Sequence, residues 1–390
     1  MRGFLRRLPS ALCSLAAFGA SVLAAAGASE NPQTFQQAPA PDGATSIKVE
    51  TLAEGLANPW SIGFLPDGAI LVTERPGRLR VVKDGALVKE PVAGVPAPYV
   101  ANQAGLFEVL PHPDFANNHL IYLSYAHGTK ESNSTRVVSA EFDGASLKNI
   151  KTVFEARPTR DKPVHYGGRL AYMPDGTMLV SLGDGFDYRE KAQTLDNGFG
   201  KIVRVNLDGT FPADNPFTKK AGALPEIWSY GHRNVQGLAV DSASGIVYET
   251  EHGPRGGDEL NVISAGKNYG WPLACYCIDY SGAKVTPFTS FKGTEQPQKY
   301  WTPSIGPSGL AVYRGALFKA WQGDLLVGAM AMRALHRIDM ENGKIVGEER
   351  YLVGERIRDV RVGPDGAVYV TTEDRSGSPV GKLLRLTPAK

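Results

Sequence analysis

Two short segments bring together residue types suited to an anionic group and a hard cation. In the segment 231–236, Arg233 supplies a planar, permanently charged fork that can bind carboxylate or quinone oxygens with two hydrogen bonds. Asn234 and Gln236 add amides beside it. The turn 252–257 is too rich in Gly and Pro for a helix or an inner strand, and it can present carbonyls to a cation that prefers oxygen. This pattern favours an anionic, metal-assisted cofactor over a hydrolytic triad alone.

His165 is the histidine whose surroundings best fit a general base. It precedes two glycines in the segment 163–170, and glycines just before a strand let the backbone approach another group closely. An imidazole titrates near neutral pH, which suits proton transfer. Asp184 ends the same unit and could orient the imidazole through a hydrogen bond. The residues alone leave open whether His165 is catalytic or structural, and whether Asp184 orients it or caps a turn.

A third candidate feature is a pair of arginines near the end of the chain. Arg356 and Arg358 alternate along a strand-like segment, which places both side chains on one face. Both side chains facing solvent is the common outcome for such a pair. Both facing a polyanion in a central cavity would be the functional outcome.

The elements that must position these residues are predicted by a repeat. An Asp-containing turn followed by an apolar, β-branched strand recurs six times, with turns at 65–68, 112–115, 173–176, 241–245, 321–324 and 363–366. In the Pro-Asp-Gly form, Pro fixes φ and Gly takes a positive φ. Repetition of a small multi-strand unit is typical of a propeller, so we predict an all-β, six-bladed β-propeller. The alternative, a pair of β-sandwiches, would not explain the recurring turn.

The first 28 residues have the composition of a secretory signal peptide. They hold arginines at positions 2, 6 and 7, an apolar stretch at 11–26, and a small-residue cleavage site that ends at Ala28. The apolar stretch is short and rich in Ala and Ser, which disfavours the alternative of a membrane anchor. We therefore expect export and removal of residues 1–28.

The rest of the chain divides into an arm and one domain. Residues 29–46 are rich in Pro, Gln and Ala and are predicted to be a flexible N-terminal arm, and 47–390 to be the propeller. Without the signal peptide, 39 Lys and Arg stand against 40 Asp and Glu, a net charge of −1. This balance argues against nucleic acid or an anionic membrane as the main partner. No later stretch is apolar enough to span a membrane.

Cys275 and Cys277 are the two cysteines that remain after cleavage of the signal peptide. An even pair in an oxidising compartment suggests a disulfide, although a one-residue spacer closes a very small ring. A metal site would need two further ligands, and no nearby Cys/His pair supplies them. A disulfide and two free thiols both remain open.

Taken together, these segments resemble the soluble, quinone-dependent aldose sugar dehydrogenases of the glucose/sorbosone dehydrogenase family. The resemblance runs from 58–62 to 381–386 and rests on a combination of motifs, among them His-Tyr-Gly-Gly-Arg-Leu, Gly-His-Arg-Asn-Val-Gln-Gly, Glu-His-Gly-Pro-Arg-Gly-Gly-Asp-Glu, Asn-Tyr-Gly-Trp-Pro and Arg-Ile-Arg-Asp. Members of this family are six-bladed propellers that bind pyrroloquinoline quinone (PQQ) and Ca²⁺, which agrees with the fold predicted from the repeat.

The resemblance implies a role for each candidate residue. His165 would remove the proton of the sugar's anomeric hydroxyl, Asp184 would orient His165, and Arg233 would polarise the carbonyl that accepts hydride. The implied contacts to PQQ are Gln103, Arg233, Asn234, Tyr280, Arg356 and Arg358. The implied Ca²⁺ ligands are the carbonyls of Gly253 and Pro254 at the quinone, and Glu259 and Tyr269 at a further, structural ion.

One position departs from the family pattern. Where the family has a lysine that contacts the quinone, this sequence has Ala331. Two residues along a strand return to the same face, so Arg333, two residues on, could replace the lysine. Otherwise the affinity for PQQ is weakened, or the protein has left quinone chemistry.

The resemblance favours a periplasmic enzyme that oxidises aldoses to lactones. The alternatives are a metal-dependent hydrolase of the lactonase kind, which would need clustered acidic and amide ligands at the propeller axis, and a non-catalytic binding propeller. Retention of His165, Arg233, Asn234, Arg356 and Arg358 together argues against the last. The preferred sugar, the electron acceptor and the choice between monomer and homodimer do not follow from the sequence.

Overall fold

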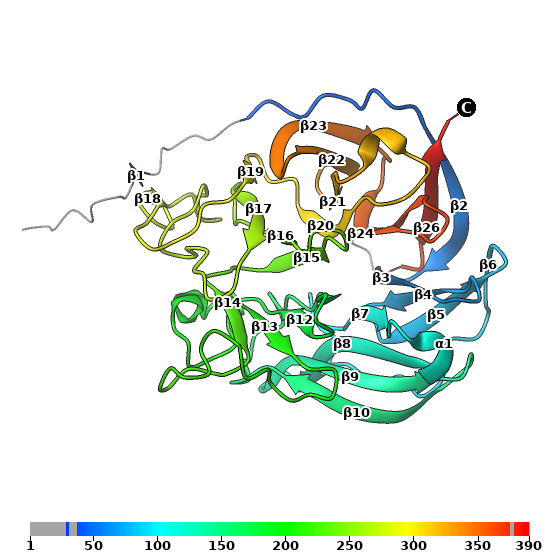
Figure 1. Ribbon diagram of the computed structural model, residues 1–390, viewed down its shortest axis with the longest axis horizontal. Coiled ribbons are helices and arrows are strands. Elements are labelled where there is room, and N and C mark those ends of the chain that lie inside the picture. Colours follow the sequence, from blue (N-terminus) through cyan, green and yellow to red (C-terminus); the bar gives the residue numbers. More distant parts are fainter. Residues whose placement is uncertain (1–28, 31–36, 375–377, 390) are drawn as a thin grey trace, which may run out of the picture.

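The computed structural model describes residues 29–30, 37–374 and 378–389, and six four-stranded antiparallel sheets surround a central axis (Figure 1). The predicted six-bladed β-propeller is therefore confirmed. The proposed signal peptide lies outside the described residues. None of the helices within the described ranges has the length and hydropathy of a membrane span.

The blades follow one another along the chain, and neighbouring strands within each blade are hydrogen-bonded. Blades 1 and 2 contain β3 (Pro59–Phe64), β4 (Ile70–Glu74), β5 (Arg78–Lys83) and β6 (Ala86–Leu87), then β7 (Leu106–Pro111), β8 (Leu120–Gly128), β9 (Asn133–Phe142) and β10 (Leu147–Glu155). Blades 3 and 4 contain β11 (Leu170–Tyr172), β12 (Met178–Ser181), β13 (Lys201–Val205) and β14 (Ile227–Tyr230), then β15 (Val235–Val240), β16 (Val247–Glu251), β17 (Asp258–Ile263) and β19 (Lys299–Trp301). Blades 5 and 6 contain β20 (Pro307–Val312), β21 (Leu325–Ala329), β22 (Ala334–Glu341) and β23 (Lys344–Leu352), then β24 (Arg356–Val362), β25 (Val368–Glu373), β26 (Gly381–Pro388) and β2 (Ile47–Leu56).

The remaining elements are short. Strand β1 (Ser29–Glu30) pairs with β18 (Phe288–Ser290), and the helical segments are α1 (Phe115–Asn118), η1 (Arg189–Gln193) and η2 (Lys319–Trp321). Residues 37–46 follow the outer side of blade 5, where Arg350 bonds to the backbone of the segment and to Asp42.

Each of the six recurring turns joins the first strand of a blade to the second. In the Pro-Asp-Gly turns, the aspartate side chain accepts the N–H two residues further on, at 3.1 Å for Asp67, 2.9 Å for Asp175 and 3.1 Å for Asp365. The turn sequence recurs because each blade needs the same tight reversal, with a side chain that pairs the exposed N–H. Each blade therefore contains one such turn, so the number of turns predicted the number of blades.

The two ends of the chain close the ring. Strand β2 pairs antiparallel with β26, so the N-terminal strand completes the blade that the C-terminal strands begin. Closure gives every blade a packed neighbour on both sides, so the only sheet edges left among the six blades are the short ones of their innermost and outermost strands.

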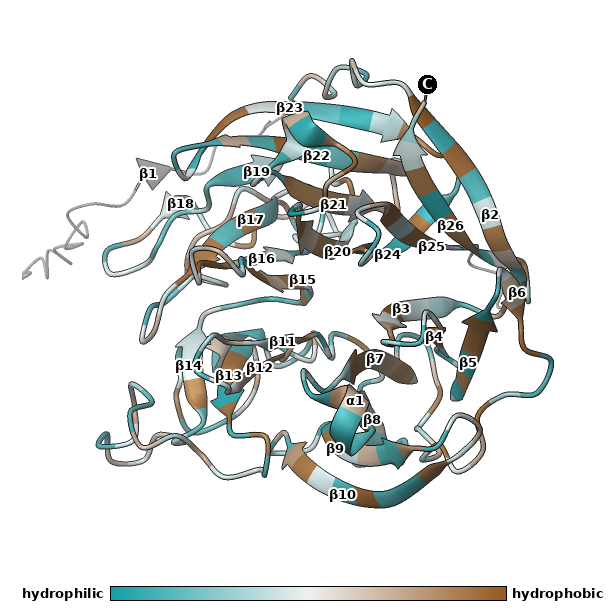
Figure 2. Ribbon diagram, turned by 45° about the vertical axis from the view of Figure 1, so that its right-hand side comes forward, coloured by the Kyte–Doolittle hydropathy of each residue, from teal (hydrophilic) through white to brown (hydrophobic). Residues whose placement is uncertain are grey.

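The hydrophobic core is divided into clusters that lie between neighbouring blades. Six large clusters each combine residues of two adjacent blades; for example, Leu71 and Leu79 of blade 1 pack with Val109 and Ile121 of blade 2. In Figure 2 the inner strands β7, β20 and β21 are largely hydrophobic, and the outer strand β23 is largely hydrophilic. Blade-to-blade packing therefore fixes the inner strands, which carry part of the site.

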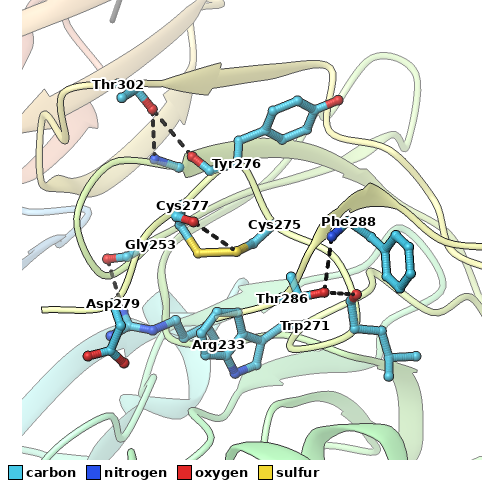
Figure 3. Close-up of a disulfide and its surroundings, with 12 residues drawn as sticks. Arg233, Gly253, Trp271, Cys275, Tyr276, Cys277, Asp279, Thr286, Phe288 and Thr302 are labelled. Carbon is cyan, nitrogen blue, oxygen red and sulfur yellow. Dashed lines mark hydrogen bonds between the residues drawn. A yellow bond between two sulfur atoms is a disulfide. The ribbon is translucent and has the colours of Figure 1, made fainter. Parts of the chain in front are cut away.

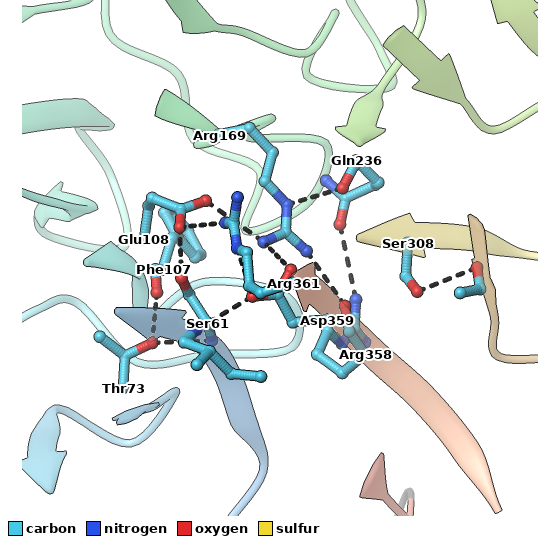
Figure 4. A network of polar contacts seen from close by, with 12 residues as sticks. Ser61, Thr73, Phe107, Glu108, Arg169, Gln236, Ser308, Arg358, Asp359 and Arg361 are labelled. Carbon is cyan, nitrogen blue, oxygen red and sulfur yellow. Dashed lines mark hydrogen bonds and ion pairs between the residues drawn. The ribbon is translucent and has the colours of Figure 1, made fainter. Parts of the chain in front are cut away.

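A buried ion network crosses the propeller axis (Figure 4). Nη1 of Arg169 lies 2.7 Å from Oδ1 of Asp359 and 3.2 Å from Oε2 of Glu108. Arg361 binds the other oxygens of the same two carboxylates, at 3.0 Å and 2.5 Å. The network balances two cations with two anions and joins the innermost parts of blades 2, 3 and 6.

Candidate active site

Most of the candidate residues lie in connections at one face of the propeller. These connections join the second strand of a blade to the third, or the fourth strand to the first strand of the next blade. Because the strands are antiparallel, both kinds emerge at the same face. The candidates in such connections are Gln103, His165, Asp184, Arg233, Asn234, Gly253, Pro254 and Arg333.

Two neighbouring cavities open among these connections. The smaller cavity has a volume of about 330 Å³, and its lining includes His165, Asp184 and Arg233. The larger has a volume of about 780 Å³, and its lining includes Gln103, Asn234, Arg356 and Arg358. Pro254 and Tyr280 line both, so the candidate base and the candidate anion-binding arginines face one continuous region.

His165 and Asp184 form a buried hydrogen-bonded pair. Nδ1 of His165 lies 2.7 Å from Oδ1 of Asp184, and both residues are almost fully buried. An ionised carboxylate only accepts hydrogen bonds, so Nδ1 carries the proton and the lone pair of Nε2 is left for the cavity. Nε2 has no hydrogen-bond partner within the described part of the chain. The pair has the arrangement of a general base with an orienting group.

The electrostatics of this pair favour a neutral imidazole. Burial lowers the pKa of His165 below its usual value, and the charge of Arg233 lowers it further, while Asp184 opposes both. Burial raises the pKa of Asp184, but the hydrogen bond from His165, the charge of Arg233 and the N–H of Phe186 hold that pKa low. An uncharged base therefore lies beside an ionised carboxylate near neutral pH.

Three neighbours hold the backbone around His165. Its N–H donates to Oε1 of Gln103 at 2.8 Å, and its carbonyl accepts from Nη1 of Arg160 at 2.6 Å. Oδ1 of Asn234 accepts the N–H of Gly167 at 3.3 Å. His165 has a φ of 54°, a left-handed conformation uncommon for residues other than glycine. The site therefore maintains a costly backbone conformation that turns this side chain into the cavity.

The guanidinium of Arg233 lies beside the glycine-rich turn. Nη1 donates to the carbonyls of His252 at 2.8 Å and Gly253 at 3.1 Å, and Nη2 lies 3.4 Å from the hydroxyl of Tyr280. The carbonyl of Gly253 therefore faces the guanidinium of Arg233. Pro254 lines both cavities at the same turn.

Three arginines and two carboxylates, those of Glu373 and Asp374, line the larger cavity, which leaves an excess of one cation. Arg358 pairs with Glu373 at 2.7 Å, and Arg356 lies 3.6 Å from the same carboxylate. Arg75 lines the cavity too, and burial together with the charge of Arg358 lowers its pKa. Arg169 of the axis network donates to the carbonyl of Arg358 at 3.0 Å and so holds the backbone of that residue. Arg356 and Arg358 therefore face the cavity rather than the outer surface.

Glu259 belongs to a buried cluster of carboxylates. Glu259 on β17 lies opposite Glu251 on β16 in the register of the sheet. Nδ1 of His232 lies 3.7 Å from an oxygen of Glu251 and 3.8 Å from one of Glu249. Nδ1 of His232 and Oε2 of Glu249 are buried without a hydrogen-bond partner, and no Lys or Arg of the described ranges forms an ion pair with these glutamates. Burial and the charge of Glu251 raise the pKa of Glu259 and of Glu249. Such a cluster has the charge and donor atoms to hold a divalent cation.

Tyr269 and Glu259 line one small cavity of about 10 Å³. The hydroxyl of Tyr269 is already engaged, since it accepts from the N–H of Ser264 at 2.8 Å and lies 2.7 Å from the carbonyl of Val262. A cation ligand from this residue would therefore be its carbonyl oxygen.

The prediction that a strand brings Arg333 to the same face as Ala331 was wrong. Strand β21 ends at Ala329 and β22 begins at Ala334, so the intervening residues form a turn and the alternation of a strand does not apply. Arg333 is exposed, has a φ of 53° and is absent from the lining of either cavity, whereas Ala331 lines the larger one. The position of the family lysine is thus at the cavity, without a cation.

A long insertion between β17 and β19 returns to the site (Figure 3). It contains a disulfide between Cys275 and Cys277, which resolves the alternative left open by the sequence. It also supplies Trp271, whose indole N–H donates to Oδ2 of Asp184 at 2.8 Å and whose ring lies 5.3 Å from the guanidinium of Arg233.

The lining residues that sequence reasoning did not single out include Arg75, Phe186 and Trp271. Arg75 stands in a short turn with no special spacing, and Phe186 follows the Asp-Gly that was interpreted as a possible cap. Only Trp271 had a signal, because it lies in the Asn-Tyr-Gly-Trp-Pro motif.

Comparison with known proteins shows which family this sequence and fold resemble. Residues 56–385 match the family described as glucose/sorbosone dehydrogenase. The chain is 40% identical over 351 residues to the aldose sugar dehydrogenase YliI of Escherichia coli (strain K12), covering 88% of this chain and 93% of that protein. The crystal structure of the soluble aldose sugar dehydrogenase from Escherichia coli in the apo-form has a TM-score of 0.84 at 40% identity, covering 88% and 100% of the two chains. The PQQ-bound aldose sugar dehydrogenase of Streptomyces coelicolor has a TM-score of 0.72 at 28% identity, covering 89% and 100%.

Proposed function

The chain belongs to the glucose/sorbosone dehydrogenase family, and we propose that it is a PQQ-dependent enzyme that oxidises aldose sugars at the anomeric carbon to lactones. The observation that carries this proposal is the His165–Asp184 pair, which presents an unprotonated Nε2 to a cavity that continues into one lined by arginines. Oxidation of an anomeric hydroxyl requires the loss of a proton and a hydride, and this pair is suited to remove the proton.

The cofactor residues are assigned by charge. PQQ, when bound, supplies the two-electron acceptor for the hydride that leaves the anomeric carbon. It carries three carboxylates, and the excess of arginines in the larger cavity fits such an anion. Arg356 and Arg358 would bind these carboxylates, while Gln103, Arg233, Asn234 and Tyr280 would border the quinone.

The chain's own residues set the proton transfer. Nε2 of His165 would accept the proton of the anomeric hydroxyl, and Asp184 would stabilise the imidazolium that forms. Arg233, close enough to lower the pKa of His165, favours an uncharged base before the substrate arrives. Burial of His165 and Asp184 limits the access of water to this hydrogen bond.

Calcium is part of the proposal. The carbonyls of Gly253 and Pro254, in the turn beside Arg233, would bind one Ca²⁺ near the quinone. Glu259 and the carbonyl of Tyr269 would bind a second ion, whose charge would balance the buried glutamates. Both assignments fit a preference for oxygen ligands.

The alternatives find less support in the structure. A lactonase-like hydrolase would need acidic side chains at the axis that are free to bind a metal, but Glu108 and Asp359 are paired there with Arg169 and Arg361. A non-catalytic binding propeller would not require a buried His–Asp pair. Export to the periplasm, with cleavage near Ala28, remains part of the proposal because residues 1–28 have the composition of a signal peptide.

The decisive test is reconstitution. Purified protein is treated with a chelator, PQQ and Ca²⁺ are added separately and together, and reduction of an artificial electron-accepting dye is followed with several aldoses. We expect turnover only when both are present. Saturable PQQ binding without turnover of any aldose would contradict the dehydrogenase assignment, and hydrolysis of lactones by the treated protein would favour the hydrolase.

A further inference from the structure

Two exposed aromatic rings border the cavity that contains His165. The exposed fraction is 46% for Phe186 and 55% for Tyr280, and both residues line the smaller cavity. Their rings are nearly parallel, with an angle of 20° and 6.4 Å between centroids. The ring of Phe186 also meets the imidazole of His165 edge to face, with 5.3 Å between centroids. An aromatic surface thus lies directly beside the candidate base.

Phe186 is held in a conformation that disfavours a large side chain. Its φ is 68°, in the left-handed region that glycine and asparagine tolerate best. Its N–H donates to Oδ1 of Asp184 at 2.8 Å, a contact that any residue other than proline could supply. The turn therefore explains the backbone conformation but not the aromatic side chain.

Packing does not explain the side chain either. Nearly half of Phe186 is exposed, so the ring gains little from burial in the free protein. A strained, exposed aromatic residue beside a catalytic group is typical of a ligand-binding position.

The rest of the rim is polar. Asp187, Arg189, Glu190 and Asp279 line the same cavity and offer hydrogen-bond partners for hydroxyl groups. A sugar ring has both kinds of surface, since its C–H groups form an apolar face and its hydroxyls project around the edge. The combination of an aromatic face with a polar rim therefore matches a pyranose ring.

We propose that Phe186, with Tyr280 beside it, forms a platform on which the C–H face of the aldose ring lies, in the cavity that contains His165. Phe186 is then a substrate-binding residue that sets the affinity for ring-shaped sugars. This inference rests on the proposed function, because it assigns the sugar to the same cavity.

The test separates binding of the sugar from chemistry and from binding of PQQ. Phe186→Leu keeps an apolar side chain at the same backbone position but removes the flat ring, and Phe186→Trp keeps a flat ring. Leu352→Ala is the control, because Leu352 is exposed to 61% on β23 and lines neither cavity. Each holoenzyme is assayed for KM and kcat with glucose, and titrated calorimetrically with 1,5-anhydroglucitol, which lacks the anomeric hydroxyl and is not oxidised.

We expect Phe186→Leu to raise KM and the dissociation constant of 1,5-anhydroglucitol by about 3- to 10-fold, the usual range for a lost aromatic contact. Because the platform would act on binding and not on the chemical step, kcat should change by less than about twofold. For Phe186→Trp, both KM and the dissociation constant should stay near the wild-type values. Unchanged KM and unchanged 1,5-anhydroglucitol binding in an active Phe186→Leu enzyme would overturn the platform. So would a fall in kcat with a shifted pH profile and unchanged KM, since Phe186 would then act through Asp184. A wild-type protein that binds PQQ but oxidises no aldose would instead refute the proposed function.

Discussion

The indole nitrogen of Trp271 lies 2.8 Å from Oδ2 of Asp184, which connects an insertion of blade 4 to the residue that orients His165. The other oxygen of Asp184 accepts from Nδ1 of His165 and from the N–H of Phe186. Both oxygens of the Asp184 carboxylate therefore accept hydrogen bonds. These contacts hold the carboxylate in place, and the carboxylate in turn holds the imidazole of His165. This arrangement requires an ionised carboxylate, because every contact at Asp184 is a donor.

Replacing His165 by alanine should abolish turnover without releasing the cofactor. His165 lies in the smaller cavity, whereas the arginines that would bind PQQ line the larger one. We expect kcat to fall about 10²- to 10⁴-fold, the range for loss of a general base. Dye-linked assays and a PQQ titration measure the two effects separately. Near-normal turnover in this variant would mean that the base lies elsewhere.

Asp184→Asn should impair the base through its hydrogen bonds. Asparagine has one oxygen, so in either orientation its amide NH₂ faces a donor from His165 and Phe186 or from Trp271. If the NH₂ faces Nδ1, the imidazole proton moves to Nε2 and the base is lost. We expect kcat to fall by about 10²-fold or more.

The same variant should change the pH dependence in a defined direction. A neutral imidazole is active, so the rate falls as the pH drops through the pKa of His165. In the wild type this fall should lie below the usual histidine pKa of about 6.5, because burial and Arg233 lower it. Asp184 favours the charged form, so its neutralisation should move the fall of the remaining activity to still lower pH. A pH profile of kcat that moves upward would contradict this assignment.

Local chemistry made much of the fold predictable from sequence. The aspartates at 67, 175 and 365 cap the turns that mark the blades, and these contacts span only two residues. Gly167 was expected to permit a close backbone approach, and a Cβ there would lie 2.5 Å from the carbonyl oxygen of Ser181. The pairing of β2 with β26 has no local signal, since it joins opposite ends of the chain.

The site was only partly predictable, for a related reason. His165 and Asp184 are 19 residues apart, on either side of one hairpin, so their meeting follows from the repeat. Trp271 reaches Asp184 by way of an insertion whose path depends on tertiary packing. Arg333 was assigned by assuming that a strand continued, and the turn after β21 reversed the chain before that residue. The two-residue alternation of side chains applies only within a strand, so it could not place a residue beyond the end of β21.

Calcium should stabilise the protein through Glu259. Binding to the folded state alone at 100 times the dissociation constant contributes about 2.7 kcal/mol, which raises the melting temperature. Glu259→Gln removes one carboxylate of the buried cluster and should reduce the difference in melting temperature between Ca²⁺ and chelator. Glu295→Gln is the control, because Glu295 is a half-exposed partner of Lys267. An equal response to Ca²⁺ in wild type and Glu259→Gln would exclude Glu259 as a ligand.

Lys201 should prove important for the loop that carries Asp184. The lysine is fully buried at the start of β13, and Nζ donates to the carbonyls of Lys191 at 3.0 Å, Ala192 at 3.1 Å and Phe199 at 2.5 Å. Lys201→Met would leave these carbonyls without that donor, and we expect a loss of about 3 kcal/mol in the free energy of unfolding.

Urea denaturation of Lys201→Met, with the exposed Lys219→Met as control, measures this loss. Because the three carbonyls lie in the connection that follows Asp184, we also expect kcat to fall in Lys201→Met. Equal midpoints for the two variants would show that the loop does not depend on Lys201.

The last prediction concerns the position of the family lysine. Ala331 lines the larger cavity, and the neighbouring carbonyl of Met330 accepts from Nη1 of Arg356 at 3.2 Å, so a lysine at 331 would add a cation near the arginines. Ala331→Lys should tighten PQQ binding by roughly 1.5–3 kcal/mol, the range for a hydrogen bond to a charged group. Arg333→Ala should change it little, because Arg333 is exposed outside both cavities. Titration of PQQ into wild type and both variants at fixed Ca²⁺ measures the effect. Weaker binding in Arg333→Ala with no gain in Ala331→Lys would mean that the turn rearranges around the cofactor. If wild type shows no saturable binding and Ala331→Lys does not restore it, the quinone-dependent function itself is wrong, because an anion that needs this many cations would have no site in the cavity.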